Sequence, residues 1–235
     1  MIKKHIPNTI TCCNLIAGCI ATYYAFQGCY YEALLFIIIG AVFDFFDGMS
    51  ARLLHVSSPI GKELDSLADD ITFGLAPSAI LFDFLKAYAA EYLPWHYLAY
   101  VAFVMAAFSA LRLAKFNLDE RQALGFIGLP TPANALFWGA LISSLDFQTW
   151  LEPYMLPEYW LYIILALIPI SCYLLVSEIP MFALKFKHWG WKGNEVKYLF
   201  LLSCIPLLWL LGTGGLAAII AWYIILSVAT NRKPT

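Results

Sequence analysis

The chain has 235 residues, of which 62% are hydrophobic and only 13% are charged, and its mean hydropathy is +0.73. Soluble domains do not have this composition, whereas long apolar runs are typical of membrane-spanning helices. The formal net charge of −2 gives no reason to expect nucleic acid as a partner. We therefore expect an all-α, polytopic membrane protein.

Eight apolar segments approach the roughly 20 residues that a helix needs to cross a bilayer. In chain order they cover about 9–27, 31–53, 64–90, 95–116, 131–146, 157–180, 195–211 and 214–230. The fifth is short, and the glycines between Gly212 and Gly215 predict a tight turn between the last two. The sequence therefore predicts one membrane domain over residues 1–235 with about eight transmembrane helices. Six spans are the alternative if the last two segments form a re-entrant hairpin.

The basic residues favour one orientation of these helices. If both termini are cytoplasmic, thirteen of the 14 Lys and Arg residues fall on the cytoplasmic side and only Lys86 lies outside. This is the bias described by the positive-inside rule. Lys3 and Lys4 precede a long apolar run without a small-residue cleavage site, which favours a retained first span over a signal peptide. We expect a multi-pass protein of the cell (inner) membrane.

Aspartates gather at the end of the second segment and the start of the third, in the stretch FDFFDGMSARLLHVSSPIGKELDSLADD, residues 43–70. Helical spacing places several of them on two faces together with small residues. These faces carry Asp44, Asp47, Gly48 and Ala51 on the second helix, and Gly61, Asp65 and Asp69 on the third. Because only a short turn joins the helices, we expect four carboxylates to converge.

Carboxylates crowded in this way repel one another, and Arg52 and Lys62 at the rim are too few to neutralise them. Oxygen ligands suit Mg²⁺, Mn²⁺ or Ca²⁺. Two divalent cations balance four negative charges and form a clamp for phosphoryl displacement. Geometry therefore favours a divalent-metal site, with structural ion pairs, a cation pathway or helix capping as alternatives.

The pattern Asp44-x2-Asp47-Gly48-x2-Ala51-Arg52-x8-Gly61-x3-Asp65-x3-Asp69 resembles the full signature of the CDP-alcohol phosphatidyltransferase family, with all eight fixed positions present. The resemblance implies a six-helix membrane core, usually a homodimer, with two further spans here. Members of this family transfer a phosphatidyl group from CDP-diacylglycerol to an alcohol and release CMP. Asp70 departs from the family pattern and lies about 100° around the helix from Asp69, so we do not expect it to be a ligand.

Four shorter motifs are similar to those of bacterial family members that use L-serine as the alcohol. They are PNTIT at 7–11, DSLADDITFGLAPS at 65–78, RLAKFN at 112–117 and GLPTPA at 128–133. The resemblance therefore implies phosphatidylserine as the product. The same chemistry with glycerol 3-phosphate, an inositol phosphate or choline is the nearest alternative, and a divalent-cation transporter is a more distant one.

The resemblance also implies roles for individual residues. Asp44, Asp47 and Asp65 would be ligands of two divalent cations, and Asp69 would contact one metal and act as the general base. Residues expected to bind the CDP moiety are Asn8, Thr11, Asp47, Gly48, Ala51, Arg52, Ser58 and Gly61.

Serine carries a carboxylate that requires a basic partner. Arg112, Lys115 and Asn117 lie at the cytoplasmic end of the fourth segment. Arg112 is the preferred carboxylate ligand because its guanidinium is planar and bidentate, and Arg121 is the alternative. Topological anchoring explains the same basic residues nearly as well. Further along, the segment KFKHWGWKGNEVK at 185–197 is typical of a membrane interface that contacts anionic lipid headgroups.

Overall fold

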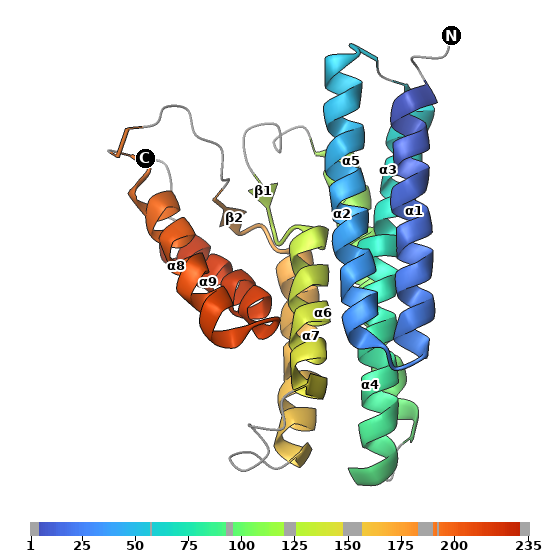
Figure 1. Cartoon of the computed structure of the whole chain (residues 1–235), viewed down its shortest axis with the longest axis vertical. Helices are drawn as coiled ribbons and strands as arrows, with labels where there is room; N and C mark the ends of the chain where they lie inside the picture. Colours follow the sequence, from blue (N-terminus) through green and yellow to red (C-terminus); the bar gives the residue numbers. More distant parts are fainter. Residues whose placement is uncertain are drawn as a thin grey trace.

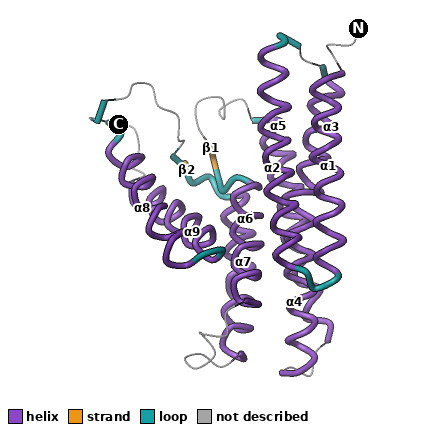
Figure 2. Tube along the Cα trace, viewed as in Figure 1, coloured by secondary structure: helices purple, strands orange, loops and turns teal. Residues whose placement is uncertain are grey.

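Figure 1 shows long helices that lie side by side, with an inclined pair of helices at one edge. The computed structural model describes residues 5–56, 58–92, 96–119, 126–147, 157–182, 190–191 and 193–230. Its helices are α1 (His5–Phe26), α2 (Tyr30–Leu53), α3 (Pro59–Asp69), η2 (Asp70–Leu75), α4 (Ala76–Tyr92), η3 (His96–Val101), α5 (Ala102–Leu118), α6 (Thr131–Phe147), α7 (Pro157–Val176), α8 (Glu195–Leu211) and α9 (Gly214–Thr230). Helix dominates the described chain (Figure 2), so the predicted all-α class is confirmed.

Five helical stretches are long and apolar enough to cross a membrane. They are His5–Phe26, Tyr30–Leu53, Pro59–Tyr88, Tyr97–Leu118 and Tyr159–Val176. Helices α6, α8 and α9 are shorter, at 17 residues each. The protein is thus a multi-pass membrane protein, while the full count of eight crossings stays a prediction.

The third predicted segment begins earlier than expected and is not a uniform α-helix. Ser58 caps α3, because its Oγ accepts a hydrogen bond from the Gly61 amide at 3.0 Å, and Pro59 fits the first turn, where its missing amide is not needed. Directly after Asp69 the helix passes through the π-helical turn η2 and continues as α4. The continuous helical segment formed by α3, η2 and α4 therefore carries acids at its first end and core residues at its second.

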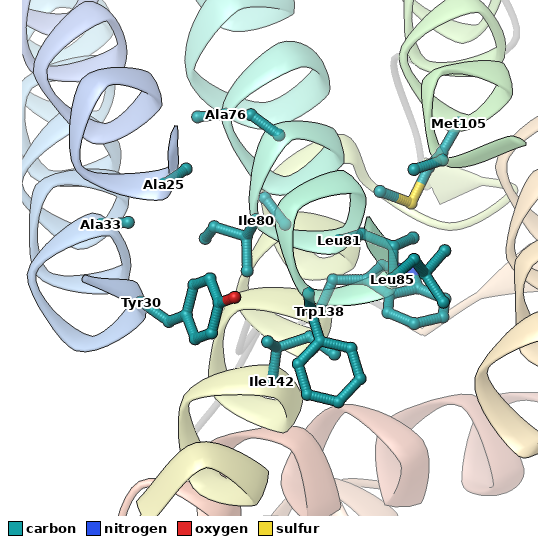
Figure 3. Close-up of a cluster of buried hydrophobic side chains, with 14 of the residues drawn as sticks. Ala25, Tyr30, Ala33, Ala76, Ile80, Leu81, Leu85, Met105, Trp138 and Ile142 are labelled. Carbon is teal, nitrogen blue, oxygen red and sulfur yellow. The ribbon is translucent and has the colours of Figure 1, made fainter. Parts of the chain in front are cut away.

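The apolar core includes side chains beside the α1–α2 turn, among them Ala25, Tyr30 and Ala33, which lie near side chains of α4 and α6 (Figure 3). Ile80 and Leu85 of α4 and Trp138 of α6 are fully or almost fully buried there. Helix α1 contributes the small residues Ala21 and Ala25, which let neighbouring helices approach closely. Close packing of small residues is the usual basis of helix association in a bilayer, where apolar lipid removes the ordinary hydrophobic driving force.

Two short strands, which the sequence does not predict, join the segment before α6 to the segment after α7. Strand β1 (Phe126–Ile127) pairs antiparallel with β2 (Pro180–Met181). The Gly128 amide extends the pairing by donating to the Ile179 carbonyl at 2.9 Å. Helix α7 accordingly ends at Val176, before the predicted residue 180.

Helices α8 and α9 form an inclined hairpin, in which α9 packs on α6 and which lies away from α1 (Figure 1). The predicted tight turn is confirmed, since α8 ends at Leu211 and α9 begins at Gly214. Gly212 adopts a positive φ of 55°, a backbone conformation that residues other than glycine rarely adopt.

Candidate active site

Three carboxylates meet where α2 ends and α3 begins. Asp44 and Asp47 come from α2 and Asp65 from α3, and one oxygen from each lies within 4.8 Å of the others. No Lys or Arg of the described chain forms an ion pair with them. Three unneutralised carboxylates at this distance form an all-oxygen donor set suited to a hard divalent cation. The residues therefore fit the predicted metal centre.

Asp69 lies beside this trio but has a different environment. It is within electrostatic range of Asp44, Asp65 and Asp47. Its Oδ1 accepts a hydrogen bond from the side-chain amide of Asn14 on α1 at 3.1 Å. One of its two oxygens is therefore bound by a side-chain amide of α1.

Thr11 orients Asp47 within the acidic trio. The Thr11 hydroxyl lies 2.6 Å from Asp47 Oδ2 and donates to it, and both side chains are buried. A charge-assisted bond of this length holds a carboxylate firmly. Thr11 thus contacts a predicted metal ligand directly.

A cavity of about 260 Å³ opens beside the acids between α1, α2 and α3. Its wall consists of Pro7, Asn8, Thr11, Asp47, Gly48, Ala51, Val56, Ser58, Gly61, Lys62 and Asp65. Seven of the eight residues predicted to bind CDP line this cavity. The exception is Arg52, which is exposed and absent from the wall.

The two glycines of the cavity have different physical roles. A Cβ at Gly61 would lie 2.9 Å from Asn8 Oδ1 and 3.0 Å from Ser58 Oγ, so glycine here permits the close approach of α1 to the start of α3. A Cβ at Gly48 would meet nothing within 4 Å. Gly48 therefore leaves space for a ligand against the α2 backbone.

Asp70 points away from the acidic trio, as the sequence predicts. A Cβ on Gly74 would lie 2.7 Å from Asp70 Oδ1 and 3.1 Å from the Cβ of Ser109, which places Asp70 on the side of the π-helical turn facing α5. Asp70 Oδ1 and Ser109 Oγ are buried without a hydrogen-bond partner. The structure thus separates the two adjacent aspartates into different surroundings.

A second cavity, of about 330 Å³, lies at the end of α5 and contains two of the predicted serine-binding residues. It is lined by Arg112, Lys115, Leu118, Asp119, Ile127, Leu175, Val176, Ser177 and Glu178. Arg112 is only 7% exposed, and its Nε has no hydrogen-bond partner. It also lies within electrostatic range of Asp69. A buried, incompletely paired guanidinium is a strong candidate for binding an anion.

The other predicted serine-binding residues have separate positions. Lys115 is exposed at the cavity. The Asn117 side-chain amide donates to Ser66 Oγ at 2.7 Å, and the Asn117 backbone carbonyl accepts from Lys62 Nζ at 3.0 Å. Asn117 thus joins α5 to α3 outside the cavity wall. Arg121 lies outside the described residues.

Sequence reasoning missed several residues that the structure brings to these sites. Asn14 follows Pro7 and Thr11 at i, i+4, i+7 spacing, so helical periodicity was a usable signal for it. Ser177 and Glu178 reach the second cavity only because β1 and β2 pair, and the sequence carries no local signal for that pairing.

Comparison with known proteins agrees with this geometry. A model of the CDP-alcohol phosphatidyltransferase family matches residues 4–168. This chain belongs to that family. In this CDP-alcohol phosphatidyltransferase, the matched region contains both acid-bearing helices and α5, whereas β2, α8 and α9 lie beyond it.

Relatives of this CDP-alcohol phosphatidyltransferase carry the name CDP-diacylglycerol–serine O-phosphatidyltransferase. The Bacillus subtilis (strain 168) protein is 39% identical over 144 residues, covering 61% of this chain and 76% of the relative. The Helicobacter pylori (strain ATCC 700392 / 26695) protein is 34% identical over 132 residues, and the match spans about half of each, 55% and 54%. A protein from Methanocaldococcus jannaschii is 28% identical over 191 residues, covering 76% of this chain and 87% of the relative.

Proposed function

We propose that this protein transfers the phosphatidyl group of CDP-diacylglycerol to the hydroxyl of L-serine, giving phosphatidylserine and CMP. The observation that carries the proposal is the juxtaposition of three carboxylates within 4.8 Å of one another and a cavity lined by the family's signature residues. The shared name of the relatives supports serine as the acceptor.

The first cavity binds the nucleotide end of the lipid substrate. Gly48 and Gly61 let the ligand and the helices approach closely, and Asn8 and Ser58 offer polar atoms at the wall. Lys62 supplies a positive charge for the diphosphate. Asp44, Asp47 and Asp65, with Asp69 beside them, hold two divalent cations, Mg²⁺, Mn²⁺ or Ca²⁺. When bound, these cations polarise the diphosphate oxygens and stabilise the CMP leaving group.

The second cavity binds the acceptor. A free amino acid is a zwitterion, and the cavity wall offers both signs of charge: Arg112 and Lys115 for the carboxylate, and Glu178 for the ammonium group. Arg112 lies within electrostatic range of Asp69, which supports binding of the acceptor beside the proposed general base. A phosphorylated acceptor would favour a uniformly basic wall, so the mixed charge supports an amino acid.

Asp69 accepts the proton of the serine hydroxyl as that oxygen attacks the phosphatidyl phosphorus. The new bond joins the serine oxygen to this phosphorus, and the bond from the phosphorus to the CMP oxygen breaks. The proton is then on Asp69 and the electron pair leaves with CMP.

The proposal includes orientation and assembly. Both termini and the acid-bearing ends of α2 and α3 lie on the cytoplasmic side of the inner membrane, and the protein is a homodimer in contact with membrane lipids. Cysteine labelling should find positions beside Arg52 reactive from the cytoplasm and positions beside Glu91 reactive from outside. Reversed labelling would put the site out of reach of cytoplasmic serine.

The decisive experiment incubates the purified protein with CDP-diacylglycerol, Mg²⁺ or Mn²⁺, and a panel of alcohols. We expect CMP release to depend on L-serine and on the metal, with phosphatidylserine as the lipid product. CMP release with glycerol 3-phosphate, an inositol phosphate or choline in place of serine would reassign the acceptor. Metal flux through proteoliposomes without CMP release would replace the enzyme with a cation transporter.

A further inference from the structure

Asn14 is a buried polar residue of α1 that is absent from the walls of both cavities, yet it contacts the candidate general base. It is fully buried, and its side-chain amide donates to Asp69 Oδ1 at 3.1 Å. The amide nitrogen, and not the oxygen, must face Asp69, because an ionised carboxylate offers only acceptors. The contact joins residues 55 positions apart in the chain, so it depends on how α1 packs against α3.

The backbone around this contact is fixed by close packing at the π-helical turn η2. The Thr72 hydroxyl of this turn donates to the Asn14 backbone carbonyl at 3.0 Å. A Cβ added to Gly18 would overlap Thr72, and one added to Gly40 would lie 2.5 Å from Thr72 Cγ2 and 2.9 Å from Asn14 Oδ1. Helices α1 and α2 therefore pack against Thr72 so closely that no side-chain atom fits at Gly18 or Gly40. Single π-helical turns frequently mark functional positions in helices.

The consequence for Asp69 is a defined orientation. A carboxylate with one oxygen bound cannot rotate freely, so Oδ2 is left to receive the acceptor proton. Proton transfer requires the base oxygen to lie within about 3 Å of the hydroxyl it deprotonates. A base that is free to rotate would spend only part of its time in that geometry.

We propose that Asn14 is a positioning residue for the transfer reaction, which holds Asp69 Oδ1 so that Oδ2 faces the acceptor hydroxyl. This inference rests on the proposed function, because it requires Asp69 to be the general base. It assigns to α1 a role in the proton-transfer step as well as in nucleotide binding.

The test is a double-mutant cycle between Asn14→Leu, which keeps the side-chain size but cannot donate, and Asp69→Asn. We expect Asn14→Leu to lower kcat about 10- to 100-fold, the range for losing one hydrogen bond to a charged group. The KM for CDP-diacylglycerol should change less than about twofold, because Asn14 does not line the nucleotide cavity, and saturating metal should not restore kcat. In the Asp69→Asn background, Asn14→Leu should cause no further loss, because the two side chains act as one unit.

Thr72→Val is the matched control. It removes the hydrogen bond from η2 to the Asn14 backbone carbonyl but leaves the contact between Asn14 and Asp69 and keeps a side chain of the same shape, so kcat should remain within about twofold of the parent. Asn14→Ser, which is smaller and cannot span the distance, repeats the test if Asn14→Leu does not fold. Additive losses in the cycle, or an unchanged kcat in a folded Asn14 variant, would overturn the positioning role. Absence of serine-dependent CMP release in the unmodified protein would instead overturn the proposed function.

Discussion

Helices α2 and α4 pack through apolar side chains in one half of the bundle, near the α1–α2 turn (the apolar half). In the other half, near the α2–α3 turn, α2 and α3 present acidic side chains (the polar half). Near the α1–α2 turn, α2 presents Ala33 and Ile37 and α4 presents Ile80, all fully buried. Near the α2–α3 turn, the equivalent faces present Asp44 on α2 and Asp65 on α3. Methyl groups attract one another at contact distance, whereas unneutralised carboxylates repel. One half can therefore pack closely by itself, whereas the other leaves negative charges that a bound cation would neutralise.

The polar half contains hydrogen-bond donors as well as acids. The carboxylates there are oriented by neutral side chains from α1, Thr11 and Asn14, which donate hydrogen bonds without adding charge. The apolar half also contains polar contacts: Trp138 donates to the neutral Ser171 hydroxyl, and Tyr30 donates to a single carboxylate, Asp83, at 3.1 Å. We expect substitutions in the polar half to change catalysis and substitutions in the apolar half to change stability.

The largest expected effect is that of Asp69→Asn. Asparagine nearly preserves the shape but cannot accept the serine proton, and it also weakens a metal contact. We predict a loss in kcat of at least about a thousandfold, combining a general-base contribution with part of a metal contribution. Affinity for CDP-diacylglycerol should be retained better than in Asp44→Asn or Asp47→Asn, each of which removes a carboxylate of the predicted metal site. Kinetics over a metal titration measure both quantities.

The adjacent residue provides the matched control for that prediction. Asp70 faces Gly74 and Ser109 and not the acidic trio, so Asp70→Asn should retain most of the activity. An Asp70→Asn variant as inactive as Asp69→Asn would mean that the polar half extends around the π-helical turn. Normal turnover of Asp69→Asn at saturating metal would remove Asp69 as the base.

The next largest effect is expected at the buried end of the acceptor cavity. Arg112→Ala should weaken serine use about 30- to 150-fold, corresponding to loss of one charged contact worth about 2–3 kcal/mol. The KM for CDP-diacylglycerol should stay nearly constant. Ethanolamine, which lacks the carboxylate, is the matched probe, and its weak use should not fall further. An unchanged serine KM would place the carboxylate elsewhere, with Lys115 and Arg121 as the next candidates.

A smaller effect is expected at the exposed edge of the same cavity. Glu178→Gln keeps the shape but removes the charge that attracts an ammonium group. Because Glu178 is solvent-exposed, we predict only a twofold to fivefold loss in kcat/KM for serine, from about 0.5–1 kcal/mol. Use of 3-hydroxypropionate, which has no ammonium group, should not decrease. Equal losses for both acceptors would exclude ammonium recognition by Glu178.

The smallest effect is expected in the apolar half. Trp138 Nε1 donates to Ser171 Oγ at 2.9 Å and joins α6 to α7. Trp138→Phe removes this bond, and hydrogen bonds between membrane helices contribute about 0.6 kcal/mol on average and about 1.7 kcal/mol at most. The free energy of unfolding in mixed micelles should fall by about that amount, with kcat and both KM values unchanged. A selective loss of serine use would show that the two halves are coupled.

The sequence alone predicts most helices and the acidic face. Apolar length indicated the long helices, because a bilayer requires about 20 apolar residues for a crossing. Helical periodicity placed Asp44 and Asp47 on one face and Asp65 and Asp69 on another, and a short turn brought these faces together. Both inferences depend on spacings within a few turns of the chain, which local geometry fixes.

How these parts form a site depends on the way the helices pack against one another. The π-helical turn after Asp69 was not predicted from the sequence. The contact between Asn14 and Asp69 and the Arg112 cavity closed by the β1–β2 pairing both join segments far apart in sequence. The physical reason is that such contacts depend on which helices pack against one another and on how closely, here at Gly18, Gly40 and Thr72. The residues on each helix are set by the chain's own periodicity, but their distances across the bundle are set by packing.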